Sequence, residues 1–275
     1  MRNEVPISVV IPYFDESEVI GRAVQSAVDQ TSQPQEIIIV NDGCVGKKRE
    51  RLENALSKVA FLNLRIIHLE VNSGSSFARN RGWQEAIGEF VAFLDADDVW
   101  HPEKLQIQYE FMANNPDIDL TGHRHAIVLN DDTWKSPSIK DPGRVTPVTL
   151  WNLLLVNQFV TPSVMIRTSY PLRFNSQQRY MEDYDLWLTM AANGAKMVRL
   201  ELDLTALFKA PFGKSGLSSH LIQMEKGELL TYWSLCKKKP ALILILPLLL
   251  AYSLIKFVRR LFVTYFQNSS FIKVK

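Results

Sequence analysis

Carboxylate side chains follow three of the four apolar segments in the first hundred residues. Glu16, Asp42 and the pair Asp95 and Asp97 each come shortly after such a segment ends. Carboxylates that converge repel one another unless a cation lies among them. Mg²⁺ and Mn²⁺ take oxygen ligands and usually bind through one or two carboxylates plus substrate phosphates. The spacing of Asp95 and Asp97 therefore favours a metal-bound diphosphate, although each aspartate alone is equally typical of a turn or a helix cap.

Alternating strands and helices must position these carboxylates. Buried strands are predicted at residues 7–11, 36–40, 64–69 and 90–94, and amphipathic helices at 18–30, 47–59 and 75–87. This order predicts an α/β fold with a mostly parallel central sheet, helices on both faces and right-handed crossovers. Ligands of such sheets bind at the carboxyl ends of the strands. The carboxylates are therefore expected to meet at one edge of the sheet.

Composition places the chain among ordinary folded proteins. Its 275 residues are 47% hydrophobic and 22% charged, which excludes a disordered, collagen-like or coiled-coil protein. The two cysteines, Cys44 and Cys236, form neither a disulfide framework nor a zinc spacing. Residues 1–6 are not a signal peptide, because they carry charges and no long apolar run. These observations favour a reducing, cytoplasmic compartment.

The distribution of charge sets the C-terminal part apart. Eight of the 31 basic residues follow Glu228 and no acidic residue does, so the preceding part carries 23 basic residues against 29 acidic ones. An anionic body argues against nucleic-acid binding. Residues 241–255 are apolar apart from Tyr252 and Ser253, with Pro247 in the middle and basic clusters on both sides. A spanning helix needs about 20 apolar residues, so we expect this segment to lie on an anionic membrane surface. A buried core helix and a true span remain alternatives.

An ordered set of motifs resembles one known family. The set is VVIPYF (9–14), VNDG (40–43), NSG (72–74), ARNRG (78–82), FLDADD (93–98) with Pro102, and EDYDLW (182–187). Together these motifs closely resemble family 2 inverting glycosyltransferases, which have the Rossmann-like GT-A fold, over residues 5–215. The resemblance implies a nucleotide-sugar-binding half at 1–130 and an acceptor-binding, catalytic half at 131–220. Residues 221–275 then form a C-terminal helical segment that associates with membranes.

The resemblance implies a role for each residue around the nucleotide. Pro12 and Tyr13 lie against the base, where an aromatic ring stacks on uracil, and Glu16 braces that loop. Asp42 resembles the aspartate that accepts a hydrogen bond from the uracil N–H. Arg79 resembles the basic residue that reaches towards the nucleotide, and its alternative role is an ion pair with a nearby carboxylate.

The same resemblance implies roles for the two acidic pairs. Asp95 faces the ribose and Asp97 binds the metal ion, Mn²⁺ or Mg²⁺, as an Asp-x-Asp motif. Because a sugar hydroxyl is a poor nucleophile, a carboxylate must take its proton as it attacks. Asp183 is the expected base and Glu182 the alternative. Both stand at the start of a predicted helix, where an acidic cap with no catalytic role is the competing interpretation.

These features predict a metal-dependent, inverting and non-processive transferase. The Gln-x-x-Arg-Trp motif and the several transmembrane helices of the family's processive synthases are absent from the sequence. The expected donor is a nucleotide-diphosphate sugar, above all a UDP-sugar, and the expected acceptor is a saccharide or a lipid-linked saccharide. We expect the acceptor in residues 130–179, and a loop at 209–219 that closes over the diphosphate with Lys209 or Lys214. The expected location is the cytoplasm, peripheral on the inner face of the cell membrane.

Two other functions compete with this prediction. A sugar nucleotidyltransferase shares a similar sheet, but it would need a glycine-rich loop with Arg and Lys after the first strand, where the sequence has PYFDE. A catalytically silent, membrane-associated binding module would need neither acidic pair. The presence of both pairs therefore favours the transferase.

Overall fold

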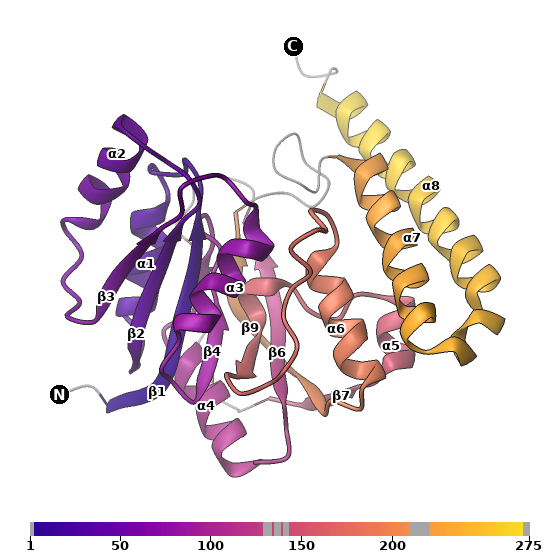
Figure 1. Cartoon of the computed structure of the whole chain (residues 1–275), viewed down its shortest axis with the longest axis horizontal. Helices are drawn as coiled ribbons and strands as arrows, with labels where there is room; N and C mark the ends of the chain where they lie inside the picture. The colour runs from indigo at the N-terminus through magenta and orange to yellow at the C-terminus, as the bar shows by residue number, and fades with distance from the viewer. Residues whose placement is uncertain (1–2, 129–133, 135–138, 140–142, 209–219, 272–275) are drawn as a thin grey trace.

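The computed structural model describes residues 3–128, 134, 139, 143–208 and 220–271, with the side chains of the last helix through Thr264. A nine-stranded sheet runs in the order β3-β2-β1-β4-β8-β6-β9-β5, and β7 pairs with β9 beside this path (Figure 1). All four predicted strands are present, as β1 (Asn3–Tyr13), β2 (Ser32–Asn41), β3 (Leu64–His68) and β4 (Phe90–Phe93). The remaining strands are β5 (Val99–Trp100), β6 (Leu120–Ile127), β7 (Val145–Val148), β8 (Met165–Arg167) and β9 (Met197–Leu207).

Strand direction divides the sheet into two parts. β1 pairs in parallel with β2 and β4, and β2 pairs in parallel with β3. Beyond β4, the short strand β8 is antiparallel to both β4 and β6, whereas β6 and β9 pair in parallel. The predicted α/β class, with a mostly parallel sheet and helices on both faces, is confirmed.

Side chains that alternate along the parallel strands build two cores, one on each face of the sheet. Val9 and Ile11 of β1 point into one core, while Val10 between them points into the other, and all three are 0% exposed. Ile37 and Ile38 of β2 divide in the same way. Strands buried on both faces read as continuous apolar runs, which is why the sequence predicted them well.

Helices cover both faces. The first face carries α1 (Ile20–Val28), α2 (Lys47–Leu56) and α4 (Lys104–Asn114). The opposite face carries α3 (Ser75–Glu85), α5 (Leu150–Leu155), α6 (Glu182–Ala192) and α7 (Leu221–Lys238). Tyr232, Leu235 and Cys236 of α7 are buried in this second core, so α7 is part of the body.

The C-terminal segment forms a helical hairpin. A short 3-10 helix (Pro240–Leu244) joins α7 to α8 (Leu246–Phe271), which lies along α7 at the edge of the molecule (Figure 1). Pro247 lies in the first turn of α8, where proline is tolerated because that turn has no partners for its N–H groups. The apolar run at 241–255 is thus divided into two helices near its start. Within the described residues, no helix is long and apolar enough to cross a membrane.

Candidate active site

A cavity of about 570 Å³ opens at the carboxyl ends of the parallel strands, where the sequence predicted the site. Its walls include every residue assigned to the site from the sequence: Pro12, Tyr13, Glu16, Asp42, Arg79, Asp95, Asp97, Glu182 and Asp183. Glu182 and Asp183 are far in sequence from the others, yet they face the same cavity. The fold therefore brings the two predicted acidic pairs to one place.

Asp95 and Asp97 project from one tight turn after β4. The Asp98 N–H donates to the Asp95 carbonyl at 3.1 Å, which closes the turn. No group of three or more His, Cys, Asp or Glu side chains among the described residues could hold a metal ion alone. Two carboxylates in one turn nevertheless suit Mg²⁺ or Mn²⁺, which complete their coordination with water and substrate phosphate oxygens. The donor set present here therefore fits a divalent cation that binds together with a diphosphate.

Arg79 of α3 joins the two acidic pairs. Its Nη2 donates to Asp95 Oδ1 at 2.7 Å, and its Nη1 donates to Glu182 Oε1 at 3.1 Å. Burial alone would lower the pKa of this guanidinium, but the carboxylates of Asp95 and Glu182 outweigh it and raise the pKa. Arg79 is thus a permanent cation that is 5% exposed. The ion pair considered from the sequence exists, but it is buried and lies in the cavity wall.

Glu182 and Asp183 occupy different environments at the start of α6. Glu182 is 7% exposed, and its Oε1 also accepts a hydrogen bond from Ser75 Oγ at 3.0 Å. Asp183 is half-buried, and its Oδ1 accepts a hydrogen bond from the Tyr184 N–H at 2.7 Å. Burial and the neighbouring Glu182 raise the pKa of Asp183 to about 7. A carboxylate with a pKa near 7 suits a general base at neutral pH.

The backbone before α6 is held in an unusual conformation. Met181, at the N-terminal boundary of the helix, has a φ of 59°, in the left-handed region that a long side chain rarely adopts. Gly227 of α7 packs against this segment, because a Cβ at that position would lie 2.7 Å from the Tyr180 carbonyl oxygen. Strain of this kind persists only where the surroundings enforce it. α7 therefore helps to fix the direction in which Asp183 points.

Asp42 anchors the loop that follows β3. Its Oδ1 accepts from the Ser73 N–H at 2.7 Å, and its Oδ2 accepts from the Gly74 N–H at 2.8 Å. The adjoining Gly43 has a φ of 81°, and a Cβ there would lie 2.4 Å from the backbone N of Asn72. The two loops approach so closely that this position requires glycine. Each carboxylate oxygen keeps a second lone pair, so Asp42 can still accept a hydrogen bond from a ligand.

The first loop differs from its expected geometry in one respect. Pro12, Tyr13 and Glu16 all line the cavity, but Tyr13 is 1% exposed and belongs to a hydrophobic core. A ring buried to this extent has almost no face for stacking. Phe14, the next residue, also lines the cavity and is 46% exposed. The Glu16 carbonyl accepts from the Val19 and Ile20 N–H groups, which begins α1.

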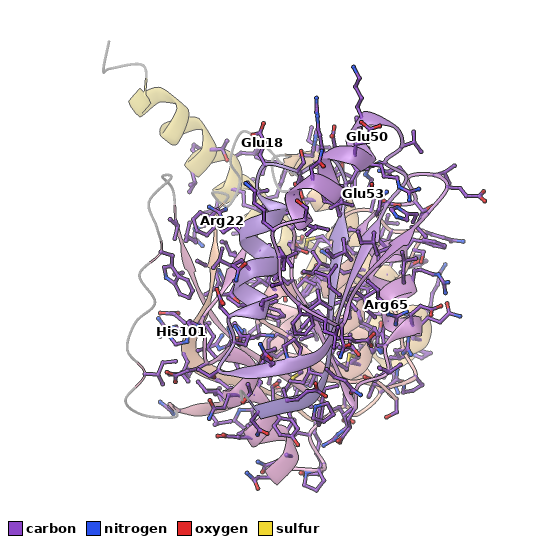
Figure 2. The ribbon with its side chains drawn as sticks, turned by 90° about the vertical axis from the view of Figure 1, so that its left-hand side faces the viewer. Glu18, Arg22, Glu50, Glu53, Arg65 and His101 are labelled. Carbon is purple, nitrogen blue, oxygen red and sulfur yellow. The ribbon has the colours of Figure 1, made fainter. Side chains whose placement is uncertain are left out.

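A contact between α1 and the Asp95–Asp98 turn had no signal in the sequence. Arg22 of α1, which is labelled in Figure 2, donates from Nη2 to the Asp97 carbonyl at 3.0 Å. Its guanidinium also lies 3.6 Å from the ring centroid of Phe208, whose N–H donates to Asp98 Oδ1 at 3.4 Å. Arg22 therefore connects the turn to the end of β9. Arg22 was not assigned to the site from the sequence, because it lies 75 residues from Asp97. It also belongs to a helix whose sequence is that of an ordinary amphipathic helix.

Part of the acceptor region expected from the sequence also lines the cavity. Val160, Thr161 and Pro162 line it together with Arg179. Met224 of α7 also lines it, although no motif in the sequence indicated this residue. The loop predicted at 209–219, with Lys209 and Lys214, lies outside the described residues.

The family match agrees with this fold and site. Residues 8–175 match the family described as Glycosyl transferase family 2. The chain belongs to this family, as the ordered motifs indicated.

Two curated relatives show how far the likeness extends. The putative teichuronic acid biosynthesis glycosyltransferase TuaG of Bacillus subtilis is 38% identical over 141 residues, which cover 51% of this chain and 54% of the relative. The amylovoran biosynthesis glycosyltransferase AmsE of Erwinia amylovora is 28% identical over 197 residues, which cover 70% and 72%. The chain spans 42% of an uncharacterized Nostoc glycosyltransferase and 54% of TuaG, or about half the length of these two relatives.

Solved structures share the fold at lower identity. TarS 1-349 of S. aureus, in complex with UDP-GlcNAc, superposes with a TM-score of 0.65 at 22% identity, over 98% of this chain and 76% of that one. The mannosyltransferase PcManGT of Pyrobaculum calidifontis, in complex with GDP-Man and Mn²⁺, gives a TM-score of 0.62 at 14% identity, over 90% and 72%. At these identities the likeness establishes the fold.

Proposed function

We propose that this chain transfers a sugar from a nucleotide-diphosphate donor, a UDP-sugar, to a saccharide acceptor with inversion at the anomeric carbon. The observation that carries the proposal is the convergence of the Asp95–Asp97 turn and Asp183 on one cavity, with Arg79 between them. One acidic site suits the leaving diphosphate and the other suits the attacking hydroxyl. The family membership and the nucleotide sugars in the named TarS and PcManGT complexes support the same reaction class.

The donor would lie along the strand ends of the parallel part of the sheet. Phe14 offers the exposed ring for the base, and Asp42 offers a lone pair for the uracil N–H. Asp95 and Asp97 would hold Mg²⁺ or Mn²⁺ against the diphosphate, and the bound cation would offset the charge that develops on the leaving group. Asp95 is already partly neutralised by Arg79, so Asp97 is expected to contribute more to cation binding.

The transfer step uses Asp183 as the base. The acceptor hydroxyl oxygen forms a bond to the anomeric carbon while its proton passes to the Asp183 carboxylate, and the bond from that carbon to the diphosphate oxygen breaks. The diphosphate leaves from the face opposite the attack, so the configuration inverts. Glu182 is less suited to this role because Arg79 and Ser75 occupy its Oε1. It would instead hold Arg79 in place and raise the pKa of Asp183.

We further propose that the acceptor is a saccharide or a lipid-linked saccharide, met at the inner face of the cell membrane, and that one sugar is added per encounter. Met224 lines the cavity, as do residues of the expected acceptor region, and it belongs to α7, the inner helix of the C-terminal hairpin. A membrane surface at the hairpin would therefore lie on the same side of the cavity as Met224. The relatives named for teichuronic acid and amylovoran biosynthesis are consistent with a polysaccharide product.

Calorimetric titration of UDP with and without Mn²⁺ tests the donor half of this proposal. We expect binding that weakens at least about tenfold without the cation, because the diphosphate then faces the Asp95 and Asp97 carboxylates alone. Asp97→Asn should remove most of the dependence on Mn²⁺. Asp117→Asn is the matched control, since Asp117 is exposed and pairs with Lys196 away from the cavity. UDP binding that is absent, or that ignores Mn²⁺ in the wild type, would contradict the proposal.

A further inference from the structure

We propose that the outward side of α8 is a docking surface for an anionic lipid bilayer, and that it binds through apolar side chains while two of the helix's basic residues face inward. The inference rests on the membrane association included in the proposed function, and it specifies the surface and the physical basis of binding. Three observations on the C-terminal hairpin carry it: the polar side of α8 is turned inward, its apolar side is turned outward, and the charges around it are basic.

Three polar residues of α8, Ser253, Lys256 and Arg260, face α7. Ser253 Oγ donates to Glu225 Oε1 at 2.9 Å. Arg260 Nη2 donates to Glu225 Oε2 and to Glu228 Oε2, both at 2.9 Å. Lys256 pairs with the same Glu228, whose side chain is 2% exposed. These contacts form a buried ionic seam between the two helices, which we call the hairpin seam.

The opposite side of α8 is apolar and exposed. Six residues at helical spacing share this side: Leu248, Leu254, Ile255, Val258, Leu261 and Phe262. Leu248 is 71% exposed and Ile255 is 66% exposed. A helix on the surface of a soluble protein has the reverse order, with apolar residues inward and polar residues outward. A contiguous exposed apolar surface of this kind marks an interaction site, and a helix with one apolar side is suited to lie in the interfacial region of a bilayer.

The charges around this surface favour an anionic bilayer over a second copy of the chain. Glu225 and Glu228 are the acidic residues of the hairpin, and both are turned into the hairpin seam. Lys237 of α7 and Arg259 of α8 are exposed basic residues of the hairpin. A symmetric dimer through α8 would bring the same basic residues of two copies together, which is unfavourable. Anionic headgroups would instead complement them.

The arrangement corrects one expectation from the sequence. The basic residues of the tail were expected to contribute to membrane binding together with the apolar run, but Lys256 and Arg260 are neutralised within the protein. Apolar burial therefore dominates, and it is insensitive to salt, whereas attraction between exposed charges is screened over about 3 Å at 1 M salt. The last turns of α8 project beyond the rest of the described chain in both views (Figures 1 and 2). The exposed side chains of Leu254 and Ile255 make the surface accessible to a planar partner.

Vesicle flotation of the full chain tests the inference. We expect the wild type to float with phosphatidylcholine–phosphatidylglycerol vesicles at low salt and to remain largely bound at high salt. The double variant Leu254→Gln/Ile255→Gln should bind at least about tenfold more weakly, since two exposed apolar side chains are replaced by polar ones. Leu62→Gln is the matched control, because Leu62 is 98% exposed on the body and should not affect flotation.

The outcomes separate this inference from the proposed function. UDP binding by each variant is measured in parallel, and unchanged binding shows that the double variant is folded. Wild-type protein that does not float with these vesicles, or a double variant that floats as the wild type does, would overturn the inference. A wild-type dimer that the double variant converts to a monomer, without vesicle binding, would also overturn it in favour of a second copy. Flotation without any UDP binding would contradict the proposed function alone.

Discussion

Two largely buried arginines, each paired with two carboxylates, show that the same charge arrangement occurs in two different settings. Arg79 lies between Asp95 and Glu182, with nitrogen–oxygen distances of 2.7 and 3.1 Å. Arg260 lies between Glu225 and Glu228, both at 2.9 Å. Their side chains are 7% and 12% exposed, respectively.

The difference is what adjoins each cluster. Arg79, Asp95 and Glu182 line a cavity together with Asp183, whose pKa is raised to about 7. Arg260 and its partners lie in the hairpin seam and are not among the residues that line that cavity. A buried ion-paired cluster is therefore weak evidence for a functional site on its own. The open cavity and the perturbed carboxyl beside it make the Arg79 cluster a candidate active site.

The largest effect is expected from Asp183→Asn. Turnover should fall by about 10²–10⁴-fold, the range for loss of a general base, because an amide cannot take the acceptor proton. Donor affinity should stay nearly unchanged, since Asp183 is not assigned to nucleotide binding. Measuring the transfer rate and the UDP affinity on the same preparation tests this prediction. A fully active variant would move the role to Glu182 or to another residue.

Replacing the two arginines tests the comparison directly. Arg79→Met leaves the buried Glu182 and the partly exposed Asp95 without their cation, so we expect the free energy of unfolding to fall by about 3–5 kcal/mol and UDP binding to weaken. Arg260→Met should cost less, about 1–3 kcal/mol, because Lys256 still pairs with Glu228. It should leave UDP binding intact.

Urea unfolding and UDP titration of both variants give the answer. Arg49→Met is the control, because its exposed i,i+4 pair with Glu53 should contribute about 0.5 kcal/mol or less. If Arg260→Met weakened UDP binding as much as Arg79→Met did, the distinction between the two clusters would be wrong.

A smaller effect is expected from Arg22→Gln. The variant loses the charged hydrogen bond to the Asp97 carbonyl and the contact with the Phe208 ring. We expect UDP affinity in the presence of Mn²⁺ to fall by about fivefold, equivalent to about 1 kcal/mol, with little change in affinity without the cation. The exposed Arg51 of α2 provides the control variant Arg51→Gln. Equal weakening with and without Mn²⁺ would show that Arg22 does not act through the metal-binding turn.

The parallel part of the fold was predictable because its signals are local. β1, β2 and β4 are continuous apolar runs buried on both faces, and the carboxylates follow them directly. β5 and β8 were not predicted, since strands of two and three residues carry no detectable period. They form because long-range pairing with β9, β4 and β6 stabilises them.

The residues of the candidate site could be predicted from the sequence, but the contacts among them could not. The contact of Arg79 with Glu182 joins positions 103 residues apart, and nothing local in the sequence indicates it. The hairpin seam is different, because a signal was present. Glu225 and Glu228 lie on one side of a helix because they are three residues apart. Ser253, Lys256 and Arg260 share one side of the next helix for the same reason. This spacing could have predicted that the two helices pack through oppositely charged sides. This spacing was overlooked because Pro247 suggested a break in the middle of the apolar segment 241–255.

The pH dependence of transfer tests the central claim most directly, since that claim makes Asp183 the base. Because burial and Glu182 raise its pKa to about 7, the carboxylate form is lost as pH falls. The raised pKa also means that the folded chain holds a proton which the unfolded chain releases near 3.8, so this group's contribution to stability decreases as pH rises from 3.8 to about 7. We predict that kcat falls about tenfold per pH unit below about 7 and is level above it, while the residual activity of Asp183→Asn lacks this acidic limb. A wild-type kcat that is constant across this range, or an acidic limb that persists in Asp183→Asn, would contradict the account.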